Sequence, residues 1–280
     1  MNRRFRCFLF GLLVVALLPS FAWAQAAGEV TSGDLKVDHG QVNWTGRTIT
    51  ATGSGAPDLN DPRARQNVAV ARLGAERVAK MDALRNILET LKGVQINSEL
   101  TVEKEMVTNE KMRTRIEGVA RNFKVVNTKY YSDGGVDVVV QMSLDGPLAS
   151  TLLNPGTKAG EVPSSGAAKN TGLVIDARGL KLIPALSPRI LDESGKVVYG
   201  ADMLDKATLE ANGVAGYFRD LSAAQESKRV AGSPLVLKAL KLADGGRTDV
   251  VLSNADAEKL RDPQSNLKFL SDARVVIVVD

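Results

Sequence analysis

The chain has 280 residues, with 36 Lys or Arg against 32 Asp or Glu, and it contains one His and one Cys. This length suffices for two ordinary domains. A single cysteine excludes an internal disulfide, a cysteine-based metal site and any framework that depends on several thiols.

The first 24 residues have the three regions of a secretory signal peptide. A positive stretch precedes an apolar run over residues 7–18, and a small-x-small cleavage site follows. The apolar run is too short to span a bilayer, which requires about 20 residues. We therefore predict a signal peptide at residues 1–24, with an uncleaved anchor as the alternative. The residues that carry these features are Arg3, Arg4 and Arg6, then Ala22, Trp23 and Ala24.

Cleavage between Ala24 and Gln25 would leave a cysteine-free mature chain, because the only cysteine is Cys7. A lipoprotein needs a cysteine at its mature N-terminus, so we expect a soluble periplasmic protein without acylation. The signal holds three of the 36 basic residues and no acidic one, so 33 basic residues would remain against 32 acidic ones. A mature chain so close to neutral argues against nucleic acid as a partner.

Composition divides the mature chain into two domains. Residues 25–40 look like a flexible lead-in, and residues 147–170 are rich in Gly, Pro, Ser and Ala without helical or strand periodicity. We predict a first domain at 41–146, a linker at 147–170 and a second domain at 171–280. Both domains should fold independently.

In the first domain, a strand over residues 42–52 precedes a long helix. Asn60 or Asp61 caps this helix, Pro62 lies in its first turn, and Gly93 follows its end. A bend is expected near Gly74. Six apolar residues spaced by three and four predict the face that packs on a sheet: Val70, Leu73, Met81, Leu84, Leu88 and Leu91.

One or two short helices are expected over residues 100–117, and a β-hairpin follows. Its strands are residues 119–131 and 136–144, joined at Ser132-Asp133-Gly134-Gly135. The second strand alternates apolar and polar residues, which predicts one buried face. The fold class is thus α+β, with the first domain a long helix packed on a three-stranded antiparallel sheet.

This order of elements resembles a known family. Over residues 48–146 the chain is similar to the Lpp-twenty lipoprotein family and to the N-terminal domain of flagellar assembly protein T. Four features carry the similarity: the glycine-rich strand end, the Ala/Arg-rich helix, Glu117-Gly118 and the hairpin with Tyr131-Ser132-Asp133-Gly134. The resemblance implies a compact α+β domain in the envelope, with roles in surface structures or adhesion. It implies no catalytic residues. The sequence departs from the family name because it has no lipidation cysteine.

The second domain also alternates strands and helices. Strands are expected over residues 172–177, 188–191, 196–199, 235–242 and 249–252, with turns at residues 192–195 and 244–246. Helices are expected over residues 201–212, 220–229 and 255–261, the last capped by Ser253 or Asn254. The apolar run at residues 273–279 is typical of a buried central strand. This half is a second α+β unit.

No residue pattern indicates catalysis, a metal or a cofactor, so we expect a protein that is not an enzyme. His39 is the only histidine and lies in the lead-in. Gly53-Ser54-Gly55 lacks the third glycine and the lysine of a phosphate loop, so we interpret it as a turn that ends the strand. The remaining candidates are acids interleaved with basic residues, which indicates surface ion pairing: Glu99, Glu103, Glu105, Glu110 and Glu117.

The hairpin is the candidate binding surface. If the strand over residues 136–144 lies at the sheet edge, its backbone could pair with another chain. Proline at Val139 or Gln141 would then weaken association more than stability. The candidate residues are Tyr131, Asp133, Gly134, Asp137, Val139 and Gln141.

Three functions remain open. The first is a binding or assembly component of the cell envelope or of a surface apparatus such as the flagellum. The second is a periplasmic carrier or chaperone with a groove for a small molecule or peptide, which a large apolar pocket would favour. The third is a carboxylate-based envelope hydrolase, which two convergent carboxyls with raised pKa would favour.

Overall fold

A computed structural model describes residues 36–37, 40–153, 162–167 and 169–280. The predicted signal peptide, His39 and most of the lead-in lie outside the described residues, as does part of the predicted linker. The described residues belong to one compact unit that spans residues 33–280. Among them, no helix is long and apolar enough to cross a membrane.

A five-stranded antiparallel sheet of order β1-β2-β3-β5-β4 forms the N-terminal half. The prediction of three strands is wrong. The strand expected over residues 42–52 is two strands, because the chain turns back at Gly46 and at Arg47, whose φ of +50° lies in the left-handed region. The strands are β1 (Lys36–Val37), β2 (Gly40–Asn43), β3 (Thr48–Gly55), β4 (Lys124–Tyr130) and β5 (Val136–Ser143).

The long helix is interrupted once, close to its start. Asp61 caps α1 (Pro62–Gln66), in agreement with one of the two predicted caps. The chain then becomes extended at Asn67, whose side chain caps α2 (Val68–Lys92) by accepting from the Ala69 N–H at 2.9 Å. Gly74 lies inside the unbroken α2, so the interruption is seven residues earlier than the predicted bend.

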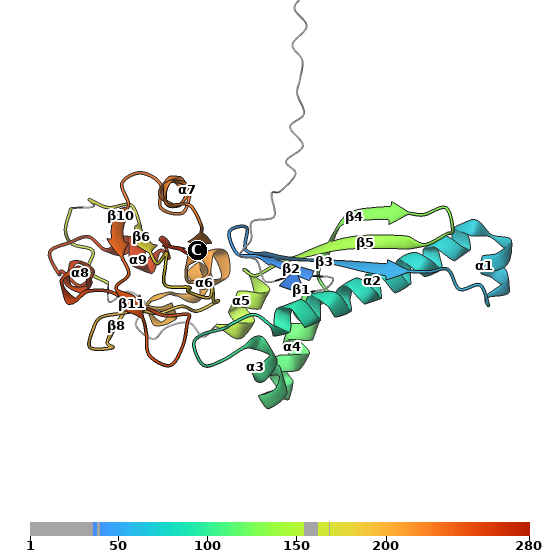
Figure 1. Ribbon diagram of the computed structural model, residues 1–280, viewed down its shortest axis with the longest axis horizontal. Helices are drawn as coiled ribbons and strands as arrows, with labels where there is room; N and C mark the ends of the chain where they lie inside the picture. Colours follow the sequence, from blue (N-terminus) through green and yellow to red (C-terminus); the bar gives the residue numbers. More distant parts are fainter. Residues whose placement is uncertain (1–35, 38–39, 154–161, 168) are drawn as a thin grey trace, which may run out of the picture. The chain divides into compact units, whose positions relative to one another are not determined.

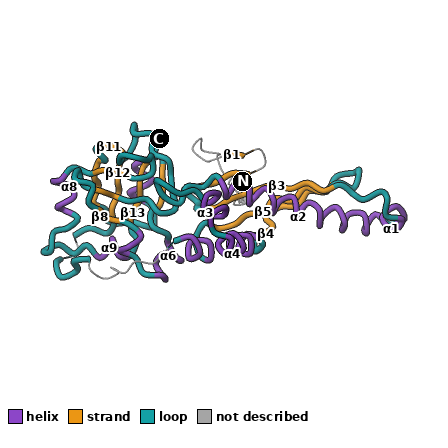
Figure 2. The backbone as a smooth tube through the Cα atoms, turned by 90° about the horizontal axis from the view of Figure 1, so that it is seen from below, coloured by secondary structure: helices purple, strands orange, loops and turns teal. Residues whose placement is uncertain are grey.

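α2 lies along the sheet (Figures 1 and 2), and small residues line its contact with β3. A Cβ atom on Gly53 would stand 2.7 Å from the Cα of Ala83, and one on Gly55 would stand 2.7 Å from the N of Ala79. The two backbones therefore approach so closely that only glycine fits on β3 and only small side chains fit on the helix. The buried alanines are Ala71, Ala75, Ala79 and Ala83.

The predicted core face of this helix is consequently wrong. Of its six residues only Leu91 is buried, and Leu73 and Met81 are 57% and 67% exposed. The other three are half-buried: Val70, Leu84 and Leu88. Leu73 and Met81 thus point away from the sheet, whereas Leu84 and Leu88 are half-buried against the core.

The rest of the N-terminal half follows the predicted order. Two short helices, α3 (Val102–Thr108) and α4 (Glu110–Ala120), occupy the expected segment. β4 and β5 form the predicted hairpin, with Val136, Val138, Val140 and Met142 buried on one face. A further helix, α5 (Pro147–Leu152), lies inside the segment predicted as a linker, and its Leu148 and Leu152 are buried.

The C-terminal half contains two four-stranded sheets. One is parallel, of order β10-β6-β13-β9, and its central β13 is fully buried, as predicted for the last apolar run. Its strands are β6 (Leu173–Asp176), β9 (Gly216–Phe218), β10 (Leu235–Lys238) and β13 (Val275–Val278). The other sheet, of order β11-β12-β7-β8, consists of β7 (Ile190–Leu191), β8 (Val197–Tyr199), β11 (Lys241–Leu242) and β12 (Val250–Val251).

Short helices connect these strands. They are the 3-10 helix η1 (Ala201–Met203), then α6 (Lys206–Asn212), α7 (Leu221–Glu226), α8 (Asn254–Lys259) and α9 (Lys268–Ser271). The caps follow sequence signals, for example Ser253 at the start of α8. The mixed α+β class is therefore confirmed.

The turn between β2 and β3 contacts the C-terminal half. The ring of Trp44 meets that of Tyr217 edge-on, with centroids 5.5 Å apart. Thr45 Oγ1 donates to the Tyr217 carbonyl at 3.0 Å, and Arg47 Nη1 donates to the Ala215 carbonyl at 2.7 Å. An apolar contact and two directional bonds therefore hold this turn in place.

A second connection runs through the segment after α2. Gln95 forms a β-bridge with Ala185, and its carbonyl accepts from the Leu186 N–H at 2.9 Å. The Ile96 carbonyl accepts from the Ser187 N–H at 2.7 Å. The two halves therefore share a bonded interface, and their independent folding stays a prediction.

Candidate partner-binding site

The predicted hairpin turn has the expected geometry. The Tyr131 N–H donates to the Gly135 carbonyl at 2.9 Å, and Asp133 accepts from the Gly135 N–H at 2.9 Å. Gly134 has a φ of +87°, which a residue with a Cβ rarely adopts. Asp133 and Gly134 thus have a structural role in closing the turn.

Asp137 is the centre of a polar cluster beside this turn. The Tyr131 hydroxyl and the Ser54 hydroxyl each donate to one of its carboxylate oxygens, the latter at 2.7 Å. The Tyr131 hydroxyl, followed by that of Ser54, lowers the pKa of Asp137 below its usual range. Lys129 Nζ lies 4.6 Å from the centroid of the Tyr131 ring. The structure therefore brings Tyr131 and Asp137 together, as part of a cluster that ties β3 to the hairpin.

The remaining two hairpin candidates do not lie at a sheet edge. β5 pairs with β3 on one side and with β4 on the other, so the ladder already engages the backbone at Val139 and Gln141. The condition set for the hairpin site, that residues 136–144 lie at the sheet edge, is therefore not met. Proline at either position would remove interior ladder bonds and weaken the fold itself.

The edge strand on the hairpin side of the sheet is β4, the other arm of the hairpin. Val125, Val126 and Tyr130 are exposed along it. The register with β5 shifts between Val125 and Asn127, and a bulge of this kind discourages pairing with another chain. Tyr130 also receives Arg72 of α2 over its ring and donates to Glu76. The edge is therefore partly closed by its own contacts.

The strongest candidate surface is the outward stripe of α2, which we define as Val70, Leu73, Met81, Leu84 and Leu88. These residues repeat at spacings of three, four or multiples of them, so they share the side of the helix opposite the buried alanines. Exposed apolar residues that gather on one face indicate an interaction surface, whereas scattered ones do not. The periodicity of the sequence predicted these residues, but as part of the core face of the helix.

Towards the end of α2 the stripe enters a groove of about 780 Å³ between α2, α3 and α4. Its apolar residues are Met81, Leu84, Leu88, Met106 and Val107, and Val107 is 80% exposed. Its charged residues lie on two rims. The α2 rim carries Arg85, Glu89 and Lys92, and the α3–α4 rim carries Glu103, Glu110, Arg113 and Glu117.

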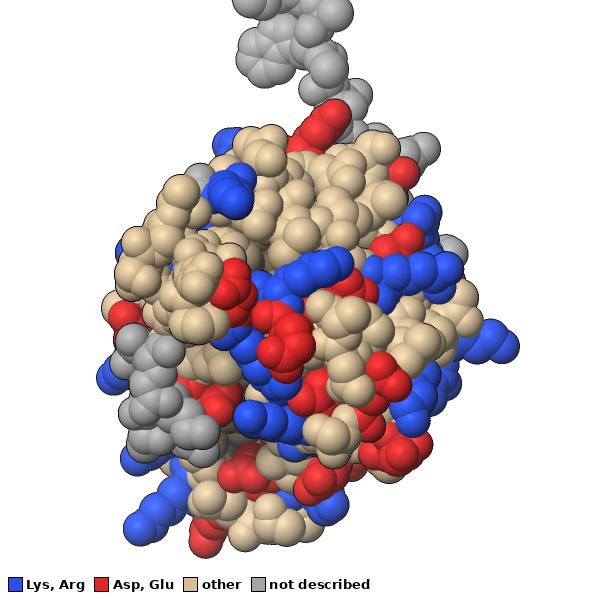
Figure 3. Space-filling model, turned by 90° about the vertical axis from the view of Figure 1, so that its left-hand side faces the viewer, with Lys and Arg blue, Asp and Glu red and all other residues tan. Residues whose placement is uncertain are grey.

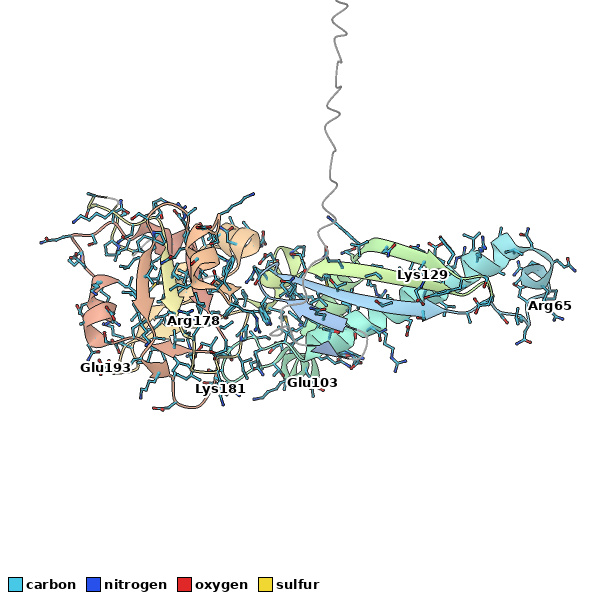
Figure 4. The ribbon with its side chains drawn as sticks, turned by 45° about the horizontal axis from the view of Figure 1, so that its top comes forward. Arg65, Glu103, Lys129, Arg178, Lys181 and Glu193 are labelled. Atoms are coloured by element: carbon cyan, nitrogen blue, oxygen red, sulfur yellow. The ribbon has the colours of Figure 1, made fainter. Side chains whose placement is uncertain are left out.

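The two rims differ in their unpaired charge. Lys92 pairs with Glu89 at 2.7 Å, and Arg113 pairs with Glu117 at 3.0 Å. Among the described residues, Arg85, Glu103 and Glu110 have no ion-pair partner. The α2 rim therefore presents an unpaired cation and the α3–α4 rim two unpaired anions. Figure 4 marks Glu103 on α3.

A second hollow of about 790 Å³ lies beside α4 and α5. It is lined in part by Leu100, Met112 and Leu153 from the N-terminal half and by Ser187 and Lys206 from the C-terminal half. Its lining mixes apolar, amide, hydroxyl and charged groups. Its size suits the carrier alternative, but its lining is not that of a large apolar pocket.

Gly53-Ser54-Gly55 has a structural role that differs from the predicted turn. The segment lies within β3, and β2 ends its pairing opposite Ala51. At Ser54, β3 no longer has β2 beside it, and the Ser54 N–H donates instead to the Asp82 carboxylate of α2 at 3.0 Å. A carboxylate therefore takes the place that a phosphate would need.

No constellation for catalysis is evident in the described part of the chain. It contains no group of three or more His, Cys, Asp or Glu residues arranged to hold a metal. The five glutamates of residues 99–117 are spread along α3, α4 and the segment before them, and Glu117 forms the expected kind of surface pair. Shifted carboxyl pKa values are lowered, as at Asp137 and Asp192, whereas the hydrolase alternative needs raised ones.

Surface charge is mixed on one face of the protein. Figure 3 shows a face on which Lys and Arg side chains alternate with Asp and Glu, with no extended patch of one sign. Such a face does not provide the basic stripe by which proteins hold a phosphate backbone.

The described fold is that of a two-part α+β protein, with a helix-on-sheet unit followed by a unit built on a parallel sheet. Residues 46–143 match the model of the LPP20 lipoprotein family, which confirms the resemblance predicted from the sequence. Residues 172–280 match the second domain of Tp0624 from Treponema pallidum, a similarity that the sequence analysis did not find. A comparison with curated proteins found no match.

Proposed function

We propose that this protein is an exported, envelope-associated binding or assembly component and not an enzyme. The LPP20 match supports export and association with the envelope. The observation that carries the binding role is the outward stripe of α2, with Leu73 and Met81 more than half exposed. Contact of such side chains with water is unfavourable, so covering them with a partner makes the free energy of binding more favourable.

The proposed location is the periplasm. The positive start, apolar run and Ala24–Gln25 cleavage site support it. Mass spectrometry of the protein from fractionated cells should find an unmodified N-terminus at Gln25. An acylated or uncleaved N-terminus would contradict this proposal.

Within this role, the outward stripe and the hairpin are two candidate contact surfaces. The resemblance to flagellar assembly protein T makes a surface apparatus such as the flagellum one candidate for the assembly served. The LPP20 match alone is equally compatible with other envelope assemblies.

Site-specific photo-crosslinking in intact cells tests the proposal. A crosslinker at Met81 should yield a discrete adduct, whereas one at Arg65, at the far end of the helical segment, should not (Figure 4). Crosslinkers at Asp133 and at Val126 test the hairpin and the β4 edge in the same experiment. No adduct from Met81, Asp133 or Val126 would contradict a binding role for this half.

The second hollow supports one alternative, a periplasmic carrier or chaperone. Its volume of about 790 Å³ falls within the range of ligand pockets, about 300 to 1,000 Å³. Native mass spectrometry of the purified protein distinguishes the alternatives. A retained small molecule that is lost in a Leu153→Trp variant would favour the carrier.

A further inference from the structure

We infer that the groove between α2, α3 and α4 is a self-association site, and that its occupant is the same groove of a second copy of this chain. The inference rests on the proposed binding role and names the partner. It depends on two properties of the groove: exposed apolar residues and the opposite unpaired charges on its rims.

The rim charges are complementary under one particular symmetry. When two grooves face each other across a two-fold axis parallel to the groove, the α2 rim of one copy lies over the α3–α4 rim of the other. Arg85 of each copy then faces Glu103 and Glu110 of its partner. None of the three groups forms an ion pair within the described part of one chain, so each of them gains an oppositely charged partner in both copies of the dimer.

A two-fold axis across the groove would instead place like rims together. Arg85 would face Arg85, and the glutamates would face glutamates, which is unfavourable. The charges therefore select the parallel arrangement. In that arrangement Met81 and Val107, exposed by 67% and 80%, come to lie at the centre of the interface.

Analytical ultracentrifugation of the chain that begins at Gln25 provides the first test. Over the micromolar range the protein should change reversibly from monomer to dimer. Met81→Asp or Val107→Asp should weaken the dimer at least tenfold. Arg65→Glu is the matched control, because Arg65 is exposed but does not line the groove, and it should leave the association unchanged.

Charge reversal provides the sharper test. Arg85→Glu alone and Glu103→Arg alone should each weaken the dimer, because the first creates four like-charge contacts across the axis and the second creates two. A mixture of the two variants should form a heterodimer tighter than either homodimer, because three of its four contacts then join opposite charges. Fluorescent labels on the two variants would measure the heterodimer by energy transfer.

The folded state must be monitored, because Glu103 lies in the first turn of α3, where a negative charge favours the helix. If Glu103→Arg loses helix content by circular dichroism, Glu110→Arg takes its place in the mixture and is monitored in the same way, because Glu110 lies in the first turn of α4. A chain that stays monomeric at all concentrations, or a mixture no tighter than its components, would overturn the inference. In either case an adduct to another protein from Met81 in cells would leave the proposed binding role intact.

Discussion

Replacing Gly53 by alanine should destabilise the protein although the change adds one methyl group. The new Cβ would lie 2.7 Å from the Cα of Ala83 and closer still to the carbonyl oxygen of Ala79. Ordinary contact begins near 3.4 Å, so α2 would have to move away from β3 by about 0.7 Å or more. Because backbone atoms are involved, no side-chain rotation can relieve the contact. Overpacking of this kind costs about 1 to 3 kcal/mol.

Gly74→Ala is the matched control, since no atom lies within 4 Å of the position that its Cβ would take. It should stabilise the helix by about 0.5 to 1 kcal/mol, because alanine is the better helix former. Urea unfolding followed by circular dichroism measures both. If Gly53→Ala were as stable as the parent protein, the close approach of helix and sheet would be wrong.

Three further experiments test other parts of the structure. Arg47→Met should lower the unfolding free energy by about 2 to 3 kcal/mol, because it removes the partner of Asp145, which is bonded to Arg47 at 2.6 Å in a largely buried position. Calorimetry measures the loss, and an unchanged midpoint temperature of unfolding would contradict this prediction. The Ser194 hydroxyl, followed by Arg261, holds the pKa of Asp192 well below its ordinary 3.8, so the stability that this carboxylate contributes should be complete above about pH 4 and decline as the pH falls further. Asp192→Asn should flatten that decline, and a decline equal to that of the parent protein would refute the assignment. Limited proteolysis should cut first within residues 147–170 but not inside α5, whose leucines are buried. Two soluble fragments would show that the halves fold independently. One inseparable unfolding transition would show that they do not.

Local signals in the sequence predicted the elements that depend on local chemistry. The helix cap at Asp61, the hairpin around Gly134 and the buried last strand β13 are each specified by a few neighbouring residues. The interruption at Asn67 was missed, because residues typical of a helix stand on both sides of this asparagine and only its extended backbone marks the break.

Features that depend on approach distance could not be predicted. Periodicity shows that α2 has a face of large apolar residues, but it does not show which face meets the sheet. That choice follows from Gly53 and Gly55, which lie in another segment and admit only alanines opposite them. The same limit explains the hairpin site, because whether β5 is an edge depends on the pairing of residues 48–55 with it.

Assignment of the outward stripe to binding, and not to folding, leads to a last prediction. Leu73→Lys combined with Met81→Lys should change the unfolding free energy by no more than about 0.5 kcal/mol, because both side chains are already exposed and lysine is a good helix former. The buried face gives the contrast: Ala79→Leu should cost about 1 to 3 kcal/mol, since Gly55 stands against that residue. If the stripe serves binding, the double lysine variant should keep its stability yet lose the crosslinked adduct at neighbouring positions such as Leu84. If it instead unfolded more easily than the parent by several kcal/mol, the stripe would belong to the core after all, and the proposed surface would have to be abandoned.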